Sequence, residues 1–558
     1  MRQHYAPASR RRSSLGGRSL PGLTAAVSAL LLGATACAPL QPLEEPPARE
    51  DVSGIPLDDF EVHEGGQLVM GLSSEPDRLD PTTSSSLYTR YVMETVCQKL
   101  YDIDEDGEIV PMLATELPDI SEDETVLTFP VREDATFADG AAFDAEAVVT
   151  TIERHLEHPN SARASEMGPV EAVEALDDHT VQVTFAEPFA PFLAALADRA
   201  GMIMSPTALE EHGEDFGNAP TCVGPFKFDR RVAQTSIDVV ADPLYYDAQD
   251  VHLDAISYRV MTDANIRAAN IRSGDVQVID SVSPQDIDAL GQEPDVEILS
   301  MGSLGYQGMT INIGNVDGIG EPAGNIDTDL AQDPRIRLAL SKAVDREALA
   351  NTVFNGWYEP ACSAVPPESP FASEASGDCP EYDPDSAREL LEEAGVEPPV
   401  QISVQVSNAQ DELRYAQALQ ASVEPAGFDL NITPIEYTAL LDAQTRGDFE
   451  ALLLGWSGRV DPHGNMFTFL QTGAGNNYSG VEDPDLDDLL DDATGVTDIE
   501  ERAEVYGDAV ARTQELNPII YLYRVRNLAA HTDGVAGIEV YPDGVVRLSN
   551  AAFVEEAP

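Results

Sequence analysis

The alternation of hydrophobic and polar residues predicts a mixture of strands and helices along the chain. Thr180–Phe185 alternates with a period of two, which is typical of a strand with one buried face. Residues 66–70 have a short strand pattern, and we expect the ordered part of the chain to begin there. Helices are predicted at residues 144–156, 333–353, 383–395 and 412–426. Because strands and helices alternate irregularly and no repeat of fixed length is present, the pattern favours α/β lobes.

The first 37 residues have the pattern of an export signal. Basic residues at 10–18 precede an apolar stretch at 23–32, and small residues then lead to Cys37. This stretch is shorter than the roughly 20 residues needed to cross a bilayer, so we expect a signal peptide over residues 1–36. The pattern resembles a bacterial lipoprotein signal, which implies a lipid on Cys37 and a location on the outer face of the cell membrane. Cleavage at Ala34-Thr35-Ala36, releasing a soluble protein, is the alternative.

The segment that follows, residues 37–64, is predicted to be a flexible tether. It combines five prolines with acidic residues and few aromatic residues, a composition that buries too little apolar surface to fold. Removing residues 1–36 leaves about 520 residues, which is enough for two lobes with separate cores.

The charge balance narrows the possible partners. The chain has 32 basic and 99 acidic residues, a net charge of −67, and only three lysines. Binding to phosphate groups depends on clustered Lys and Arg, so we expect no nucleic-acid partner and no attraction to an anionic membrane surface. Such an acidic surface suits a saline exterior, where counterions screen its self-repulsion, or reflects an acidic bias of the whole proteome.

Cysteine parity predicts two disulfides. If Cys37 is lipidated, the four remaining cysteines form an even set in an oxidising compartment. Cys362 with Cys379 is the favoured pair, because a proline-rich loop with little regular structure joins them. Cys97 with Cys222 follows by elimination. A zinc site is the weaker interpretation, because the chain has no Cys-x-x-Cys motif or close Cys/His pair, and we expect neither a metal nor another cofactor.

Four segments carry a resemblance to a known family. The first is 75–81, followed by a helix that ends at 99–101. The second combines 110–114, 127–132 and 137–140, and the third is Gly224-Pro225-Phe226-Lys227-Phe228. The fourth combines 333–340, 343–346, 382–384 and 387–391. In this order and spacing they resemble the extracytoplasmic solute-binding proteins of family 5, the peptide, nickel and opine class that serves ABC importers.

The resemblance implies a bilobal α/β clamshell like that of periplasmic binding proteins, with two crossover strands as the hinge. Lobe I would combine residues 65–305 and 525–558, with a subdomain near 105–215, and lobe II would be residues 306–524. The implied function is an exported, monomeric receptor that captures a small peptide-like or anionic solute between its lobes and delivers it to ABC permease subunits. The alternative is an envelope sensor or scaffold that uses the same cleft.

The segment 452–462 is the strongest candidate for ligand contact. An apolar strand ends there at Gly455, and the loop that follows includes Gly458 and exposes Trp456, Ser457, Arg459 and Asp461. Glycines are expected where a backbone must approach a ligand closely. The resemblance agrees, since it implies that family ligands lie against this strand end. The alternative for the tryptophan is a place in the core. The remaining candidates are Asn476 and Tyr478 in a Gly-rich loop, Tyr88 after the first family segment, and Tyr306 near the expected hinge.

Arg459 is a departure from the family pattern. The resemblance implies that peptide-binding relatives have an acidic residue three positions after the motif tryptophan, and this chain has Arg459 at that position. A guanidinium there would repel a peptide ammonium and would suit a carboxylate or phosphate, so we expect a solute with an anionic group. Internal neutralisation by Asp461 is the alternative.

Enzymatic alternatives fit poorly. Ser457 follows a strand as in a serine-hydrolase elbow, but Arg459 stands where that motif requires glycine. We therefore expect no catalytic residues.

Overall fold

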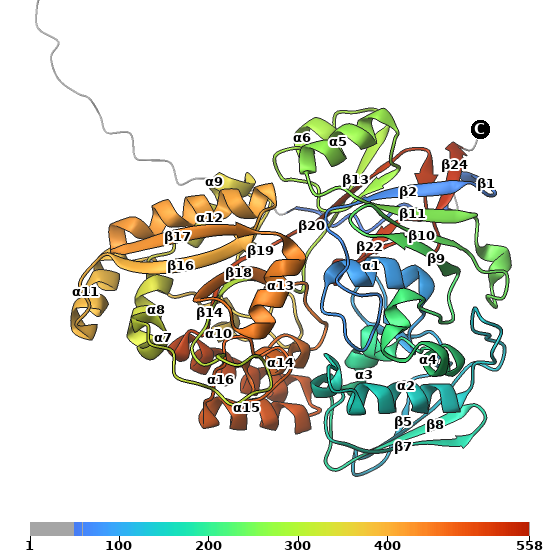
Figure 1. The fold of residues 1–558 in the computed structure, drawn as a ribbon, viewed down its shortest axis with the longest axis horizontal. Coiled ribbons are helices and arrows are strands. Elements are labelled where there is room, and N and C mark those ends of the chain that lie inside the picture. Colours follow the sequence, from blue (N-terminus) through green and yellow to red (C-terminus); the bar gives the residue numbers. More distant parts are fainter. Residues whose placement is uncertain (1–48, 58–59, 557–558) are drawn as a thin grey trace, which may run out of the picture. The chain divides into compact units, whose positions relative to one another are not determined.

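A seven-stranded sheet forms the centre of the first lobe (Figure 1). The computed structural model describes residues 49–57 and 60–556. The strand order is β13-β20-β12-β2-β11-β10-β9, with bounds β2 (Gln67–Leu72), β9 (Phe226–Val232), β10 (Ser236–Ala241), β11 (Ala255–Val260), β12 (Val278–Ile279), β13 (Val296–Met301) and β20 (Asn527–Thr532). Central β2 pairs in parallel with β11 and β12. Its residues 68–72 are all buried, as expected for a strand covered on both faces.

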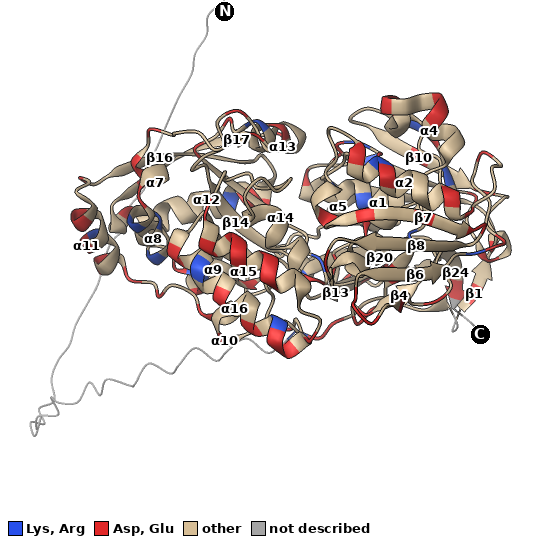
Figure 2. Cartoon of the chain, turned by 90° about the horizontal axis from the view of Figure 1, so that it is seen from below, with Lys and Arg blue, Asp and Glu red and all other residues tan. Residues whose placement is uncertain are grey.

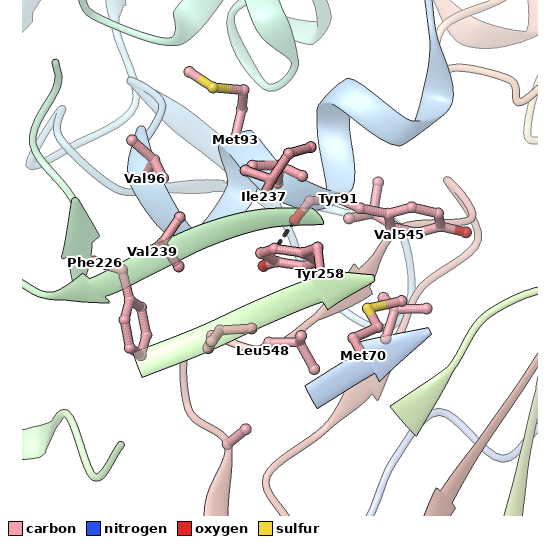
Figure 3. Close-up of a cluster of buried hydrophobic side chains, with 14 of the residues drawn as sticks. Met70, Tyr91, Met93, Val96, Phe226, Ile237, Val239, Tyr258, Val545 and Leu548 are labelled. Atoms are coloured by element: carbon pink, nitrogen blue, oxygen red, sulfur yellow. Dashed lines mark hydrogen bonds between the residues drawn. The ribbon is translucent and has the colours of Figure 1, made fainter. Parts of the chain in front are cut away.

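Helix α1 (Leu87–Val96) packs against this sheet, and the side chains between helix and sheet form the main hydrophobic core of the first lobe. Tyr91, Met93 and Val96 lie close to residues of β10 and β11 in Figure 3. Tyr258 is fully buried, and its hydroxyl donates to the carbonyl oxygen of Tyr91 at 3.3 Å. A buried tyrosine needs such a partner, so this contact fixes the helix on the sheet. The other helices beside the sheet are α5 (Ala264–Ser273) and α6 (Ile287–Leu290).

A smaller unit extends the first lobe. Its four-stranded antiparallel sheet has the order β5-β6-β8-β7, with bounds β5 (Asp119–Ile120), β6 (Val126–Pro130), β7 (Val170–Asp177) and β8 (Thr180–Phe185). The hairpin β3 (Tyr101–Ile103) and β4 (Ile109–Pro111) and the helices α2 (Ala145–Glu157), α3 (Phe192–Leu196) and α4 (Pro206–His212) complete it. Burial alternates along β8, and Asp144 caps α2, so both sequence predictions are confirmed.

A six-stranded sheet forms the centre of the second lobe. Its order is β15-β19-β14-β18-β16-β17, with bounds β14 (Tyr306–Ile311), β15 (Glu359–Pro360), β16 (Val400–Ser407), β17 (Phe428–Ile435), β18 (Ala451–Trp456) and β19 (Ile519–Arg524). Its helices are α7 (Asp329–Gln332), α8 (Pro334–Lys342), α9 (Arg346–Phe354), α10 (Glu374–Gly377), α11 (Pro384–Ala394), α12 (Gln410–Val423), α13 (Tyr437–Arg446), α14 (Phe467–Leu470), α15 (Pro484–Gly495) and α16 (Ile499–Leu516). No described helix has both the length and the apolar character needed to span a bilayer.

Two helix predictions need correction. The single helix expected at 333–353 is two helices, α8 and α9, because the side chain of Asp345 accepts a hydrogen bond from the Ala348 amide and starts a new helix. The helix expected at 412–426 begins earlier, at Gln410, and ends in a 3-10 turn over 424–426. Helix α11 is confirmed, with Asp383 as its N-cap and Gly395 in the left-handed conformation at its end.

The chain crosses between the two large sheets twice. It leaves the first sheet after β13 and enters the second at β14, and it returns between β19 and β20. Arg524 connects the two crossings, since its buried guanidinium donates to the carbonyl oxygen of Gly305 at 2.6 Å. The same group also donates to the carbonyl oxygens of Ser363 and Val365.

Order begins earlier than the sequence predicted. Within the segment expected to be a tether, β1 (Phe60–His63) pairs with β24 (Ala552–Glu556), which in turn pairs with β21 (Val535–Ala536). Val52 also exchanges two backbone hydrogen bonds with Ser300. These contacts use backbone groups at sheet edges, so they require no apolar pattern in the sequence. A last pair of strands is β22 (Glu539–Val540) and β23 (Val546–Arg547).

Acidic and basic side chains are distributed differently. Figure 2 shows Asp and Glu along surface helices such as α11 and α15. Among the described residues, ten arginines are buried: Arg90, Arg163, Arg199, Arg267, Arg337, Arg346, Arg459, Arg502, Arg524 and Arg547. Nine carboxylates of the described residues are buried as well, so the buried charges nearly balance and the acidic excess lies on the surface.

The part of the chain that the structure describes contains two disulfides, Cys97–Cys222 and Cys362–Cys379. These are the pairings that the sequence favoured. The first links the end of α1 to the segment before β9, across 125 residues of sequence, and the second closes a loop with a separation of 17 residues.

Removing the longer-range disulfide should destabilise the protein more. In the chain-entropy model, replacing Cys97 and Cys222 by Ala lowers the free energy of unfolding by about 5 kcal/mol, and replacing Cys362 and Cys379 lowers it by about 3 kcal/mol. Urea unfolding of the two double variants measures both losses. Peptide mapping without reduction checks the pairing itself, and free thiols at Cys97 and Cys222 in exported protein would contradict it.

Candidate functional site

A cavity of about 290 Å³ lies between the two large sheets. The first lobe contributes Ser73, Tyr88, Tyr91, Arg267 and Ser281, and the second contributes Phe354, Tyr358, Asp411, Glu412, Glu436, Tyr437 and Tyr523, among others. A smaller cavity of about 60 Å³ shares part of this lining, including Trp456 and Ser457, and is also lined by Tyr306, Phe469 and Tyr478. Because both lobes supply walls, a solute bound here would be held by both.

Another cavity, of about 420 Å³, lies within the first lobe. Its polar walls are already paired with one another: Lys99 with Asp102, and the Gln98 amide with the hydroxyls of Tyr245 and Tyr246. Because no residue of the second lobe lines it, we take the cavity between the sheets as the candidate site.

The end of β18 forms one wall of the candidate site. Trp456 is half-buried there, and its indole N–H donates to the Asn465 side-chain oxygen at 3.0 Å. A Cβ atom at Gly455 would lie 2.3 Å from the Gln307 side chain, and one at Gly458 would lie 2.2 Å from the Leu304 backbone. The two glycines are therefore required by close packing against the chain itself, which the sequence analysis attributed to a ligand.

Arg459 and Asp461 lie elsewhere than expected. Neither lines the two cavities between the lobes. The Nε atom of Arg459 is 2.6 Å from a carboxylate oxygen of Asp198, which belongs to the first lobe. Asp461 instead accepts two hydrogen bonds from Arg502, at 2.6 and 2.8 Å. In this structure the Arg459 charge is thus directed at Asp198 rather than at a solute or at Asp461.

Asp198 is shared between two arginines. It also accepts a hydrogen bond from Arg90 Nε, at 2.8 Å, and all three side chains are at least nine-tenths buried. Burial alone would raise the pKa of Asp198, but Arg459 and Arg90 hold that pKa well below its ordinary value. Burial lowers the pKa of Arg459 to about 9, although Asp198 opposes this change. The carboxylate therefore stays charged and joins one arginine from each lobe.

The other predicted residues divide between the cavities and the core. Ser457 lines both cavities, Tyr88 lines the larger one, and Tyr306 and Tyr478 line the smaller one. Asn476 lines neither cavity and is buried, where its side-chain oxygen accepts a hydrogen bond from the Tyr478 hydroxyl at 3.0 Å. Its role in the structure is to hold the Gly-rich loop.

Several lining residues were missed by the sequence analysis. Tyr437 of the second lobe meets Tyr88 of the first edge to face, with ring centroids 5.3 Å apart. Asp411 and Glu412 stand in the first turn of α12, where acidic residues are common for helical reasons alone. Tyr523 lies in a continuously buried strand and gave no signal of exposure to a cavity.

Direct hydrogen bonds join the lobes around the site. The Ser283 hydroxyl donates to the Asp411 carboxylate at 3.1 Å, and the side-chain amide of Gln410 donates to the Asp263 carboxylate at 3.0 Å. The Ala190 amide donates to the Thr494 carbonyl oxygen at 3.0 Å. With the pair between Arg459 and Asp198, these contacts describe a closed arrangement of the lobes.

Comparison with known proteins identifies the family. The model of the bacterial extracellular solute-binding proteins, family 5, matches residues 108–478. The chain belongs to this family. It is an exported solute-binding receptor that works with an ABC importer, and it is not an enzyme.

Individual relatives agree with this assignment. The glutathione-binding protein GsiB of Salmonella paratyphi A is 26% identical over 491 residues, covering 85% of this chain and 92% of that protein. The binding protein AgaA of A. tumefaciens R10, solved with agropinic acid, is 25% identical with a TM-score of 0.78, covering 88% and 99% of the two chains. DppA of Helicobacter pylori, solved with the peptide STSA, shares the fold at 22% identity, with a TM-score of 0.80 and coverage of 88% and 99%.

Replacing Asp198 by Asn should destabilise the receptor strongly. The change leaves Arg459 buried without a counter-charge, and breaking a buried ion pair costs about 3–5 kcal/mol. Urea unfolding measures the loss. The matched control is Asp385→Asn, because Asp385 is exposed and pairs with exposed Arg388, and exposed pairs contribute little. Equal losses in the two variants would contradict the role of Asp198.

Proposed function

We propose that this receptor is anchored to the outer face of the cell membrane by a lipid on Cys37 and acts as a monomer. In this proposal it closes over one compact solute and hands that solute to the permease of its importer. The observation that carries the solute-binding part of the proposal is the cavity of about 290 Å³ whose walls come from both lobes. The lipid anchor is supported by the signal pattern that leads to Cys37. Cys37 itself lies outside the described residues.

The size of the cavity supports a compact solute. A volume of about 290 Å³ is near the lower end of the range for small-molecule sites. The names of the relatives agree, since glutathione and agropinic acid are small molecules. The anionic group expected from Arg459 has no support in the site, because the guanidinium is directed at Asp198.

Solute binding should make the receptor more compact. Two lobes joined by two crossings enclose a solute by rotating toward each other, so the radius of gyration should fall and the melting temperature should rise. Small-angle scattering and thermal melting with dipeptides, tripeptides, glutathione, opines and disaccharides test this. A solute that binds without compaction would contradict closure, and the absence of any binder would count against the receptor function.

Replacing Cys37 by Ser should release the protein from the membrane. Without the thiol no acyl chains can be attached, and the cell-surface location is lost. Fractionation of cells that express the native protein and Cys37→Ser compares membrane and medium. If the variant stays in the membrane fraction to the same extent as the native protein, the lipid anchor is wrong.

A further inference from the structure

Glu412 differs from the other carboxylates that line the cavity between the lobes. Asp411 pairs with Arg414 at 2.9 Å, and Glu436 caps the first turn of α13. Among the described residues, no basic side chain lies within ion-pair distance of Glu412, although Arg267 and Arg414 are close enough to lower its pKa slightly. Burial outweighs them and raises the pKa of Glu412. This carboxylate therefore lacks a direct counter-charge.

Three tyrosines line the cavity together with Glu412. Tyr88, Tyr358 and Tyr523 all line the same cavity. Burial raises the pKa of each, and the negative charge of Glu412 raises it further. Tyr88 comes from the first lobe and the other two from the second, so closure completes this group of aromatic rings.

The two arginines that line the cavity are engaged elsewhere. Arg267 donates to the carbonyl oxygens of Met261 and Ser281, at 2.7 and 2.9 Å. Arg526 pairs with Asp51 and donates to the Glu50 carbonyl oxygen. Neither neutralises Glu412, so the cavity presents a negative charge within an aromatic wall.

We propose that the solute carries a protonated amine and that Glu412 binds it. An ammonium group would supply the missing counter-charge through a charge-assisted hydrogen bond, and tyrosine rings attract cations through their faces. The start of α12 favours a carboxylate, which lowers the cost of holding Glu412 inside. This inference rests on the proposed function, because it requires that the cavity between the lobes takes the solute.

Matched pairs of solutes test the inference. The primary amines are glutathione, alanyl-alanine and glucosamine, and each partner is the same molecule with its amine acetylated. Calorimetry on the native protein should show binding of at least one amine, and acetylation should weaken that binding by about 100-fold, because it removes the charge that pairs with Glu412. Disaccharides without an amine complete the set.

Variants assign the effect to Glu412. Glu412→Gln keeps the shape of the side chain and should lose about 100-fold in affinity for the amine, while its affinity for the acetylated partner stays unchanged. The control is Glu424→Gln, at an exposed acid just beyond the same helix, which should bind as the native protein does. Circular dichroism and thermal melting without solute confirm that both variants fold.

The possible outcomes separate the two proposals. Equal binding of the acetylated partner, unchanged amine affinity in Glu412→Gln, or closure on a disaccharide with no amine bound would overturn the role of Glu412 and leave the receptor function standing. If no solute of any kind binds, the proposed function fails, and the inference falls with it.

Discussion

A carboxylate buried between two guanidinium groups, one from each lobe, is the contact on which the closed arrangement depends. Asp198 accepts from Arg90 within the first lobe and pairs with Arg459 of the second. Charges removed from water are costly unless they are paired, so these groups favour the arrangement in which they meet. The cavity walls, with Tyr88 facing Tyr437, are brought together by the same closure.

Buried arginines also organise the second lobe by itself. Arg337 donates to the carbonyl oxygens of Leu330, Ala331 and Leu516, and Arg346 donates to that of Tyr521. A guanidinium has five N–H donors in a fixed plane, so one side chain can satisfy several carbonyl groups at the ends of different elements. Arg337 therefore joins α8 to α7 and α16, and Arg346 joins α9 to β19.

Local features of the fold could be predicted from the sequence, and pairings between distant segments could not. Neighbouring residues determine the N-cap and the C-terminal glycine of α11. They also determine the alternation of buried and exposed positions along β8. Arg459 pairs with Asp198 of the other lobe, and no pattern in the neighbouring sequence predicts that partner. Glu412 looked like an ordinary acid of a first helical turn, since only the folded chain shows which carboxylates in a cavity already have cations. In the site, the strand end with Trp456 was predictable because glycines mark it, whereas the tyrosine wall comes from separate elements.

The hydrogen bond from Arg524 to Gly305 has a mechanical consequence. It joins one chain crossing to the other at the edge of the second sheet, so sliding of the crossings past each other would break this contact. Two linkers fastened in this way leave rotation about one axis as the easiest relative motion of the lobes. Each closing event then follows the same path, and solutes of different shape meet the same wall residues in the same order. On this view the hinge fixes the direction of closure, and the side chains that line the cavity fix which solutes fit.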